Sequence, residues 1–170
     1  IRRPPRSTLF PYTTLFRSKL RNVAGYNIKA NFIEGTGLNI EKILIKFQEF
    51  MKEQYSSIDK NFLEREGRLL FLAFIKPIIN GVGFAFKEVQ ISEEKRLDVV
   101  ITYNKNKYII ELKIWRGEEY HEKGIKQLFD YLNVNGQNKG YLLIFNFNKN
   151  KEYKKEEVLI EGKEIFEVFV

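Results

Sequence analysis

The sequence contains no cysteine and a single histidine, His121. These two absences exclude disulfide bonds, thiolate metal sites, cysteine nucleophiles and metal sites that need several histidines. A metal bound by this chain must therefore be held by oxygen atoms, which favours hard cations of the magnesium type. No apolar run approaches the ~20 residues needed to cross a bilayer. We expect a soluble cytoplasmic protein with no membrane contact.

The composition is that of a folded domain. The 170 residues have room for one compact domain with an appendage. Hydrophobic residues make up 44% of the chain and aromatic residues 15%, which is enough for a core and too much for a disordered chain. The net charge is +7, but four arginines lie in residues 1–18, and the rest holds only 25 basic against 22 acidic residues. Such a mild excess fits nucleic-acid contact and ordinary solubility equally well.

The first 18 residues differ from the rest of the chain. They hold three of the four prolines, repeat the triplet Thr-Leu-Phe and show no helix or strand period. The whole string resembles the in-frame translation of a sequencing-adapter oligonucleotide. The alternative is a natural basic arm that binds nucleic acid. We expect residues 1–18 to add nothing to the core, and the true N-terminus of the gene to be missing.

The spacing of apolar residues changes along the chain from a helical to a strand period. An amphipathic helix is expected over residues 40–51, after a short strand near 27–33. A second helix is expected over 60–75, with N-caps among Ser56, Ser57 and Asp59 and an end at Pro77. Further elements are expected as strands at 84–91, 96–103 and 107–115, a helix at 118–133, a strand at 141–147, and a hairpin at 158–170. This α-β-β-β-α-β order with a terminal hairpin predicts a three-layer α/β/α domain.

The expected strand at 107–115 carries two charged residues inside an apolar run. Glu111 and Lys113 are two residues apart, so both point to the same face of a strand. Both are costly to bury without a partner or a metal. Asp98 in the preceding strand is the candidate partner. A two-residue loop at 104–105 places it opposite Glu111, a loop at 105–106 places it opposite Lys113, and a three-residue loop moves it to the other face.

This set of side chains has the chemistry that phosphodiester hydrolysis needs. Two converging carboxylates repel one another and tend to take up a proton. A divalent cation relieves the repulsion, acts as a Lewis acid and leaves positions open for a substrate phosphate. Lys113 is suited to stabilise the negative charge of the transition state or to orient the attacking water.

Asp98, followed after a 12-residue gap by Glu111-Leu112-Lys113, resembles the motif of the PD-(D/E)xK nuclease superfamily. The resemblance implies that superfamily's α-β-β-β-α-β core and Mg²⁺ or Mn²⁺ as cofactor. It assigns Asp98 and Glu111 as metal ligands, with the Leu112 carbonyl as a third ligand and Lys113 as the residue that stabilises charge. A glutamate on the upstream helix matches Glu66, which would bind metal or water.

The family's later helix often carries a glutamine and a tyrosine four residues apart. This pair matches Gln127 and Tyr131, which would touch the substrate or water.

Longer stretches resemble the nuclease-like C-terminal domain of bacterial AAA-like ATP-binding proteins: Glu66-Gly-Arg, Lys76-Pro-Ile-Ile-Asn-Gly, Arg96-Leu-Asp-Val-Val, residues 109–121 and residues 139–145. Residues 59–170 would then be the nuclease-like domain and residues 19–58 the tail of a truncated upstream module with one amphipathic helix. The resemblance also implies an ATPase module in the full-length protein. Leu97 stands where the family often has proline.

Each assignment has an alternative. Glu111 and Lys113 are also compatible with a cross-strand salt bridge on a solvent-facing sheet. Glu66 is also compatible with a surface ion pair to Arg65 or Arg68, while Glu64 competes for its role but is expected away from the apolar helix face.

Gln127 and Tyr131 are also typical of half-buried helices. His121 is interpreted as a helix-surface residue, Trp115 as the edge of the core, and Arg116 as a candidate phosphate contact. The expected function is metal-dependent hydrolysis of nucleic acid, with DNA favoured. The alternatives are a catalytically silent module that binds nucleic acid or its own ATPase, and a purely structural regulatory domain.

Overall fold

The computed structural model describes residues 31–54, 64–90 and 96–170. The predictions for residues 1–18, for the N-caps at 56–59 and for the first residues of the second helix lie outside the described residues. Within the described part, no helix is both long enough and apolar enough to cross a membrane.

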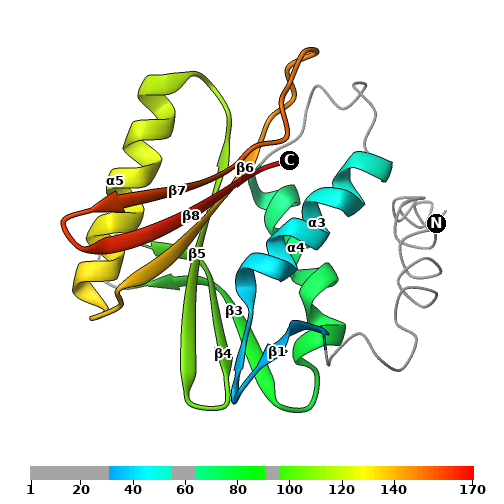
Figure 1. The fold of residues 1–170 in the computed structure, drawn as a ribbon, viewed down its shortest axis with the longest axis vertical. Helices are drawn as coiled ribbons and strands as arrows, with labels where there is room; N and C mark the ends of the chain where they lie inside the picture. Colours follow the sequence, from blue (N-terminus) through cyan, green and yellow to red (C-terminus); the bar gives the residue numbers. More distant parts are fainter. Residues whose placement is uncertain (1–30, 55–63, 91–95) are drawn as a thin grey trace, which may run out of the picture.

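A mixed six-stranded sheet forms the centre of the domain (Figure 1). Its strand order is β3-β4-β5-β6-β8-β7, and the bounds are β3 Gly83–Gln90, β4 Arg96–Tyr103, β5 Asn106–Ile114, β6 Lys139–Phe145, β7 Lys155–Ile160 and β8 Lys163–Phe169. The β3-β4-β5 meander and the β7-β8 hairpin are antiparallel, whereas β5, β6 and β8 run parallel. The strands predicted from residue 84 onward are all present, β4 with its predicted bounds and the others with ends shifted by up to three residues. The strand expected near 27–33 lies mostly outside the described residues, and residues 31–32 are helical.

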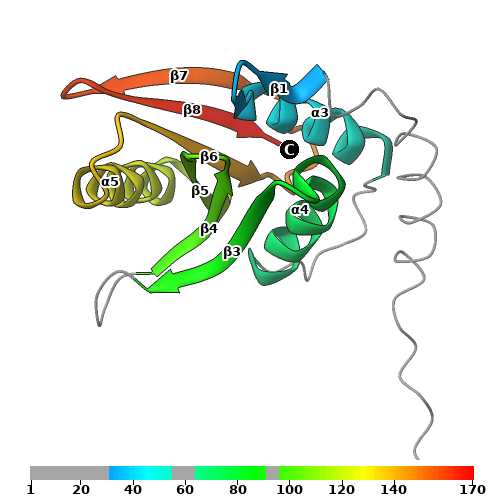
Figure 2. The same ribbon diagram turned by 90° about the horizontal axis from the view of Figure 1, so that it is seen from below.

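Helices cover both faces of this sheet (Figure 2). Helices α3 (Ile40–Gln54) and α4 (Glu64–Ile79) pack on one face, around a core that contains Phe47, Phe71 and Phe145. Helix α5 (Glu118–Val134) packs on the other face through Leu128 and Leu132. The expected three-layer α/β/α architecture is confirmed.

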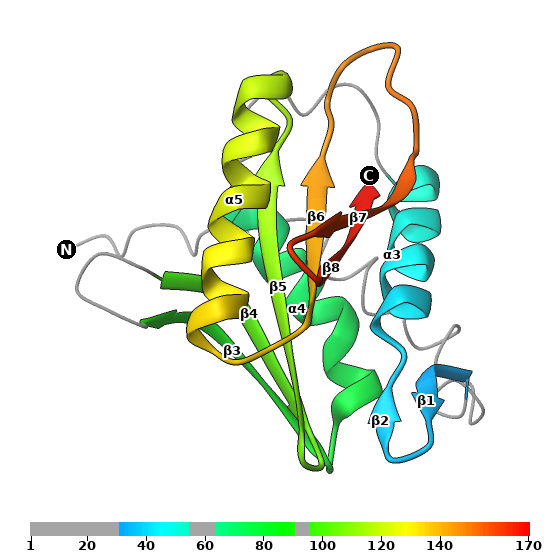
Figure 3. The ribbon, with the colours of Figure 1, turned by 60° about the vertical axis from the view of Figure 1, so that its left-hand side comes forward.

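Helix α3 belongs to the same hydrophobic core as the sheet. Its apolar stripe contains Ile40, Ile43, Leu44, Phe47 and Met51, all almost fully buried. The helix follows a short hairpin of β1 (Ile33–Glu34) and β2 (Gly37–Leu38), shown beside it in Figure 3. The stripe expected from the sequence therefore packs within the described fold.

Helix α4 extends further than expected. It passes through Pro77 and ends at Ile79, before Gly81 with φ +88°. A proline inside a helix costs ~3 kcal/mol. Ile78 and Ile79 are each only 4% exposed, and burying a side chain of this type contributes about 1.5–3 kcal/mol. The burial of these two residues offsets the cost of Pro77, which the sequence pattern alone did not reveal.

Candidate active site

The β4–β5 hairpin brings Asp98 and Glu111 to one face of the sheet. Tyr103 pairs with Asn106 and Val99 with Ile110, so the loop has two residues, 104–105. Continued by one residue, this register places Asp98 opposite Glu111. Of the three registers considered from the sequence, the one with the two-residue loop at 104–105 forms. Asp98 and Glu111 both lie on the sheet face that α5 covers.

Two contacts fix the Asp98 carboxylate. Its Oδ1 atom lies 2.6 Å from Nη1 of Arg68 on α4. Its Oδ2 atom accepts a hydrogen bond of 3.0 Å from the backbone N–H of Leu112 on β5. Both side chains of the ion pair are largely buried, at 11% exposure for Arg68 and 16% for Asp98. Asp98 thus ties β4 to both α4 and β5.

Glu111 is the most buried acid of the centre, with 1% exposure. Its Oε1 atom lies 3.0 Å from Nζ of Lys113, while Oε2 is buried with no hydrogen-bond partner among the described residues. Burial, and secondly the negative charge of Asp98, raise the pKa of Glu111 to about 8, against the lowering effect of Lys113. Glu111 therefore holds a proton near neutral pH unless a further positive charge is present.

Lys113 lies beneath α5 at a point of close approach between the helix and β5. Burial, the largest single effect, lowers the pKa of Lys113. The charge and hydrogen bond of Glu111, with the charges of Glu64 and Asp98, together outweigh it, so the pKa is raised. A Cβ atom at Gly124 of α5 would lie 3.1 Å from Cγ of Lys113. The absence of a side chain at Gly124 therefore gives the lysine stem its space, and the lysine remains cationic.

Helix α4 contributes Glu64 as well as Arg68 to the centre. Oε1 of Glu64 accepts hydrogen bonds from the Ile114 backbone N–H at 3.4 Å and from the Tyr120 hydroxyl at 3.5 Å. Its charge also raises the pKa of Lys113. Glu64 and Arg68 are four residues apart and so share one helix face.

The prediction that Glu66 lies on a buried, apolar face of its helix was wrong. That face was expected to be apolar and buried, but Leu69 is 49% exposed and Ala73 is exposed. The buried face instead runs through Arg68, Phe71 and Ile75. At ~100° per residue, Glu66 leaves the helix roughly opposite to Arg68. The structure brings Glu64 to the end of β5.

Gln127 and Tyr131 face the same centre from α5. Nε2 of Gln127 donates a hydrogen bond of 2.7 Å to the Tyr131 hydroxyl. Burial chiefly raises the pKa of Tyr131, and the charges of Glu111 and Asp98 add to this effect.

Arg116 is exposed in the loop before α5, with its guanidinium 5.5 Å from the centroid of the Tyr120 ring. Arg116 is thus accessible to a ligand.

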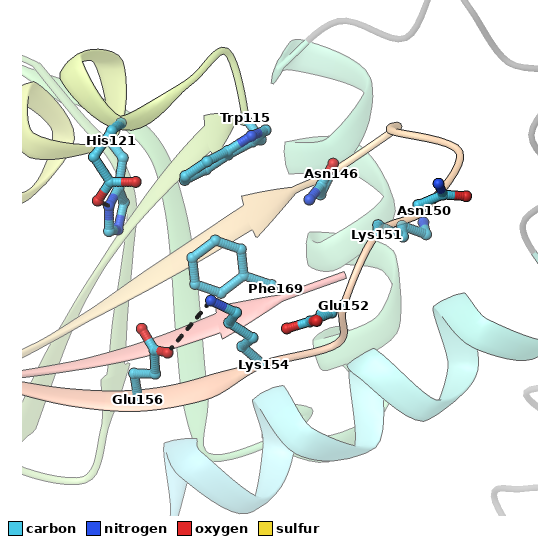
Figure 4. A pocket seen from close by; sticks show the side chains of 10 residues that line it. Trp115, His121, Asn146, Asn150, Lys151, Glu152, Lys154, Glu156 and Phe169 are labelled. Carbon is cyan, nitrogen blue, oxygen red and sulfur yellow. Dashed lines mark ion pairs between the residues drawn. The ribbon is translucent and has the colours of Figure 1, made fainter.

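His121 was wrongly interpreted as a surface residue. Its Nε2 atom lies 2.8 Å from Oε2 of Glu167, which is fully buried on β8. Its ring also packs against Trp115 and Phe169. Figure 4 shows these rings at a pocket of about 350 Å³, lined also by Asn146, Asn150, Lys151, Glu152, Lys154, Glu156 and Glu118. Sequence reasoning missed this pair, because Glu167 lies 46 residues from His121.

The donor set of the centre suits a hard divalent cation. Among the described residues, one oxygen atom of Glu111 has no hydrogen-bond partner, and burial, followed by the charge of Asp98, raises the pKa of Glu111. Asp98 is a further oxygen donor, opposite Glu111 on the neighbouring strand β4. Oxygen donors of this kind are those that Mg²⁺ and Mn²⁺ prefer. Among the described residues no group of three histidine, aspartate or glutamate side chains is arranged to hold a metal ion. Any cation here would therefore need water or substrate oxygens as well.

One comparison with known proteins finds a similarity over part of the chain. Residues 80–156 match the family model described as the PD-(D/E)XK nuclease superfamily. The matched segment runs from the turn after α4 into β7 and includes Asp98, Glu111, Lys113, Gln127 and Tyr131. No curated protein matches the chain. The matched segment and the mixed sheet flanked by helices agree with a PD-(D/E)XK nuclease fold. Members of this superfamily are generally nucleases.

Proposed function

We propose that this domain hydrolyses phosphodiester bonds in nucleic acid with the help of a divalent cation, Mg²⁺ or Mn²⁺. The observation that carries the proposal is the environment of Glu111. This acid is buried beside Asp98, one of its oxygens contacts Lys113, and the other has no hydrogen-bond partner among the residues that the structure describes. Burying such a group is costly unless it serves a ligand. The match to the nuclease superfamily over the same residues supports the proposal.

The residues have separate roles in this proposal. Asp98, Glu111 and the Leu112 carbonyl would hold the cation, and Glu64, or Glu66 as first expected, would hold water beside it. When bound, the cation supplies Lewis-acid activation of the phosphate and of the attacking water. Lys113 stabilises the negative charge that develops on the phosphate in the transition state. These groups are already oriented by the β4–β5 hairpin, which lowers the cost of orienting them during the reaction.

Substrate contacts are proposed for three further side chains. Arg116 would pair with a phosphate, and Gln127 and Tyr131 would touch the substrate or an active-site water from α5. We favour DNA as substrate and a bacterial, cytoplasmic setting in which an ATPase module accompanies the domain. Support for these finer points comes from the resemblance of residues 59–170 to the C-terminal domain of AAA-like ATP-binding proteins.

A catalytically silent module is the second candidate. It is favoured by the ion pair between Arg68 and Asp98, because the guanidinium already neutralises a carboxylate that the cation would use. Such a module would bind nucleic acid or its ATPase without cleaving anything.

A cleavage assay separates the two candidates. Wild-type protein would be incubated with single- and double-stranded DNA and RNA, with Mg²⁺, Mn²⁺ or EDTA. We expect cleavage that requires the cation and falls ~10²–10³-fold or more in Lys113→Ala, because one charge-stabilising donor is removed. Lys123→Ala, which removes an exposed lysine of α5, is the matched control. Absence of cation-dependent cleavage on every substrate would favour the silent module.

A further inference from the structure

Two exposed phenylalanines lie beside the candidate active site. Phe84 is 67% exposed and Phe86 is 47% exposed, and their ring centroids are 6.3 Å apart at an interplanar angle of 31°. Both are on β3, at the edge of the sheet that lies furthest from β7 (Figure 2). Large apolar side chains exposed side by side often mark a binding surface.

Strand register places these rings on the catalytic face. Phe86 pairs with Val100, and Phe84 with Thr102. Val100 belongs to the cluster beneath α5, on the face that also carries Glu111. Asp98 lies two residues from Val100, so Phe86 and Asp98 are diagonal neighbours ~7–8 Å apart. Phe86 is therefore close to Asp98, and Phe84 lies two residues further along the same face of β3.

This face of β3 is accessible because α5 covers other strands of the sheet. The helix packs on β5, β6 and β8, and the exposure of both rings shows that it does not cover them. Lys107 pairs with Thr102 and so adds a positive charge to this face, two strands from Phe84, where its Nζ atom donates a hydrogen bond of 2.6 Å to Oδ1 of Asn135. Aromatic rings with a nearby cation suit a nucleic-acid strand, whose bases stack on rings and whose phosphates pair with lysine.

We propose that Phe84 and Phe86 form a stacking platform for unpaired bases next to the scissile phosphate, so that the preferred substrate is single-stranded nucleic acid. The proposal rests on the nuclease function proposed above and specifies its substrate. Bases in a duplex are stacked inside the helix and cannot lie on the rings, whereas unpaired bases can. A second copy of the chain that pairs along the β3 edge would also cover these rings. It would not explain why Phe86 lies close to Asp98.

Binding without a divalent cation tests the platform apart from catalysis. Wild type, Phe84→Ala, Phe86→Ala, the double variant and Phe86→Trp would be titrated in EDTA with a short oligothymidylate carrying 2-aminopurine, and with its duplex. We expect the affinity for the single strand to fall about tenfold per ring lost. Phe86→Trp should retain binding, and duplex binding should change little. Leu159→Ala, at an exposed position (74%) on β7 at the opposite edge, is the control.

Three results would overturn the platform: equal single-strand affinity in wild type and double variant, an equal loss on duplex, or a change from dimer to monomer in sedimentation. The cleavage assay is run on the same proteins. If wild type cleaves nothing while the phenylalanine variants lose single-strand binding, the nuclease proposal fails and the platform stands. If cleavage requires the cation but is indifferent to both rings on single strands, the platform alone fails.

Discussion

Arg68 of α4 and Asp98 of β4 form a largely buried ion pair, with Nη1 2.6 Å from Oδ1. Asp98 also raises the pKa of its neighbour Glu111. The guanidinium therefore compensates part of the negative charge of the centre and helps to hold the Asp98 carboxylate in place.

Replacing Arg68 by methionine should destabilise the metal-free protein by about 3 kcal/mol, because it leaves Asp98 buried without a counter-charge. Added Mg²⁺ or Mn²⁺ should restore part of this loss, because the cation supplies the missing positive charge. Urea unfolding with and without the cation measures both effects. Arg65→Met, at an exposed position in the same helix, is the control and should change little. A loss that no cation reduces would argue against a metal site at Asp98.

The pH dependence of stability should carry the signature of Glu111. Its pKa is about 8 in the folded protein and 4.5 in its ordinary state. Between these values the folded protein holds a proton that the unfolded chain has lost, so the free energy of unfolding falls as the pH rises. The contribution reaches ~1.4 kcal/mol per pH unit.

Glu111→Gln cannot ionise and should lack this slope, so its stability relative to wild type should increase from pH 4.5 to 8. Urea unfolding in EDTA across this range measures the difference, with exposed Glu119→Gln as the control. Parallel curves for Glu111→Gln and wild type would contradict the raised pKa.

The acid from α4 can be identified by comparing two matched variants. Glu64→Gln removes the charge that lies at the end of β5 and near Lys113. Glu66→Gln removes a charge two residues along the helix. We expect Glu64→Gln to lower cleavage by ~10-fold or more and Glu66→Gln to lower it less, on the scale of a general acid–base or orienting group. The opposite order would restore the role first expected for Glu66.

Much of the fold could be predicted from the sequence, because its signals are local. The alternation around Glu111 and Lys113 predicted which strand faces carry charge, and a two-residue loop was one of the registers it allowed. In the terminal hairpin, Glu161 and Gly162 both have positive φ, the backbone that a tight two-residue turn requires. Local patterns of this kind depend on neighbours that the sequence itself displays.

The parts that the sequence did not predict depend on contacts between distant segments. The sequence analysis considered Arg68 only as an alternative surface partner of Glu66, and it did not predict the ion pair of Arg68 with Asp98, 30 residues away. The prediction of which face of α4 is buried was wrong, because Leu69 and Ala73 suggested an apolar face that is exposed in the fold. Which helix face meets the sheet is decided by packing against β3, β4 and β5, and a single helix does not encode it.

The pair of His121 and Glu167 should stabilise the end of the sheet. Glu167 is fully buried, and its Oε2 atom contacts Nε2 of His121 at 2.8 Å. His121→Ala leaves this carboxyl group without its partner and should lower the free energy of unfolding by about 2–4 kcal/mol. His121→Ala with Glu167→Leu should recover part of the loss, since neither polar group then remains buried. Thermal unfolding of the single and double variants measures the coupling, and purely additive effects would contradict it.

Asp98→Asn tests whether the carboxylate holds a cation. The substitution removes a negative charge from the donor set, so calorimetric titration with Mn²⁺ should show an affinity lower by at least ~10–100-fold, the range seen for lesser changes around metal sites. It also removes the charge that faces Arg68, so the metal-free variant should be less stable than wild type. Lys113→Ala, in contrast, should bind Mn²⁺ at least as tightly as wild type, because it removes a positive charge beside Glu111. The two variants should therefore both lose cleavage while differing in metal affinity. If Asp98→Asn and wild type bind Mn²⁺ equally, Asp98 is not a metal ligand, and its role is confined to the ion pair with Arg68.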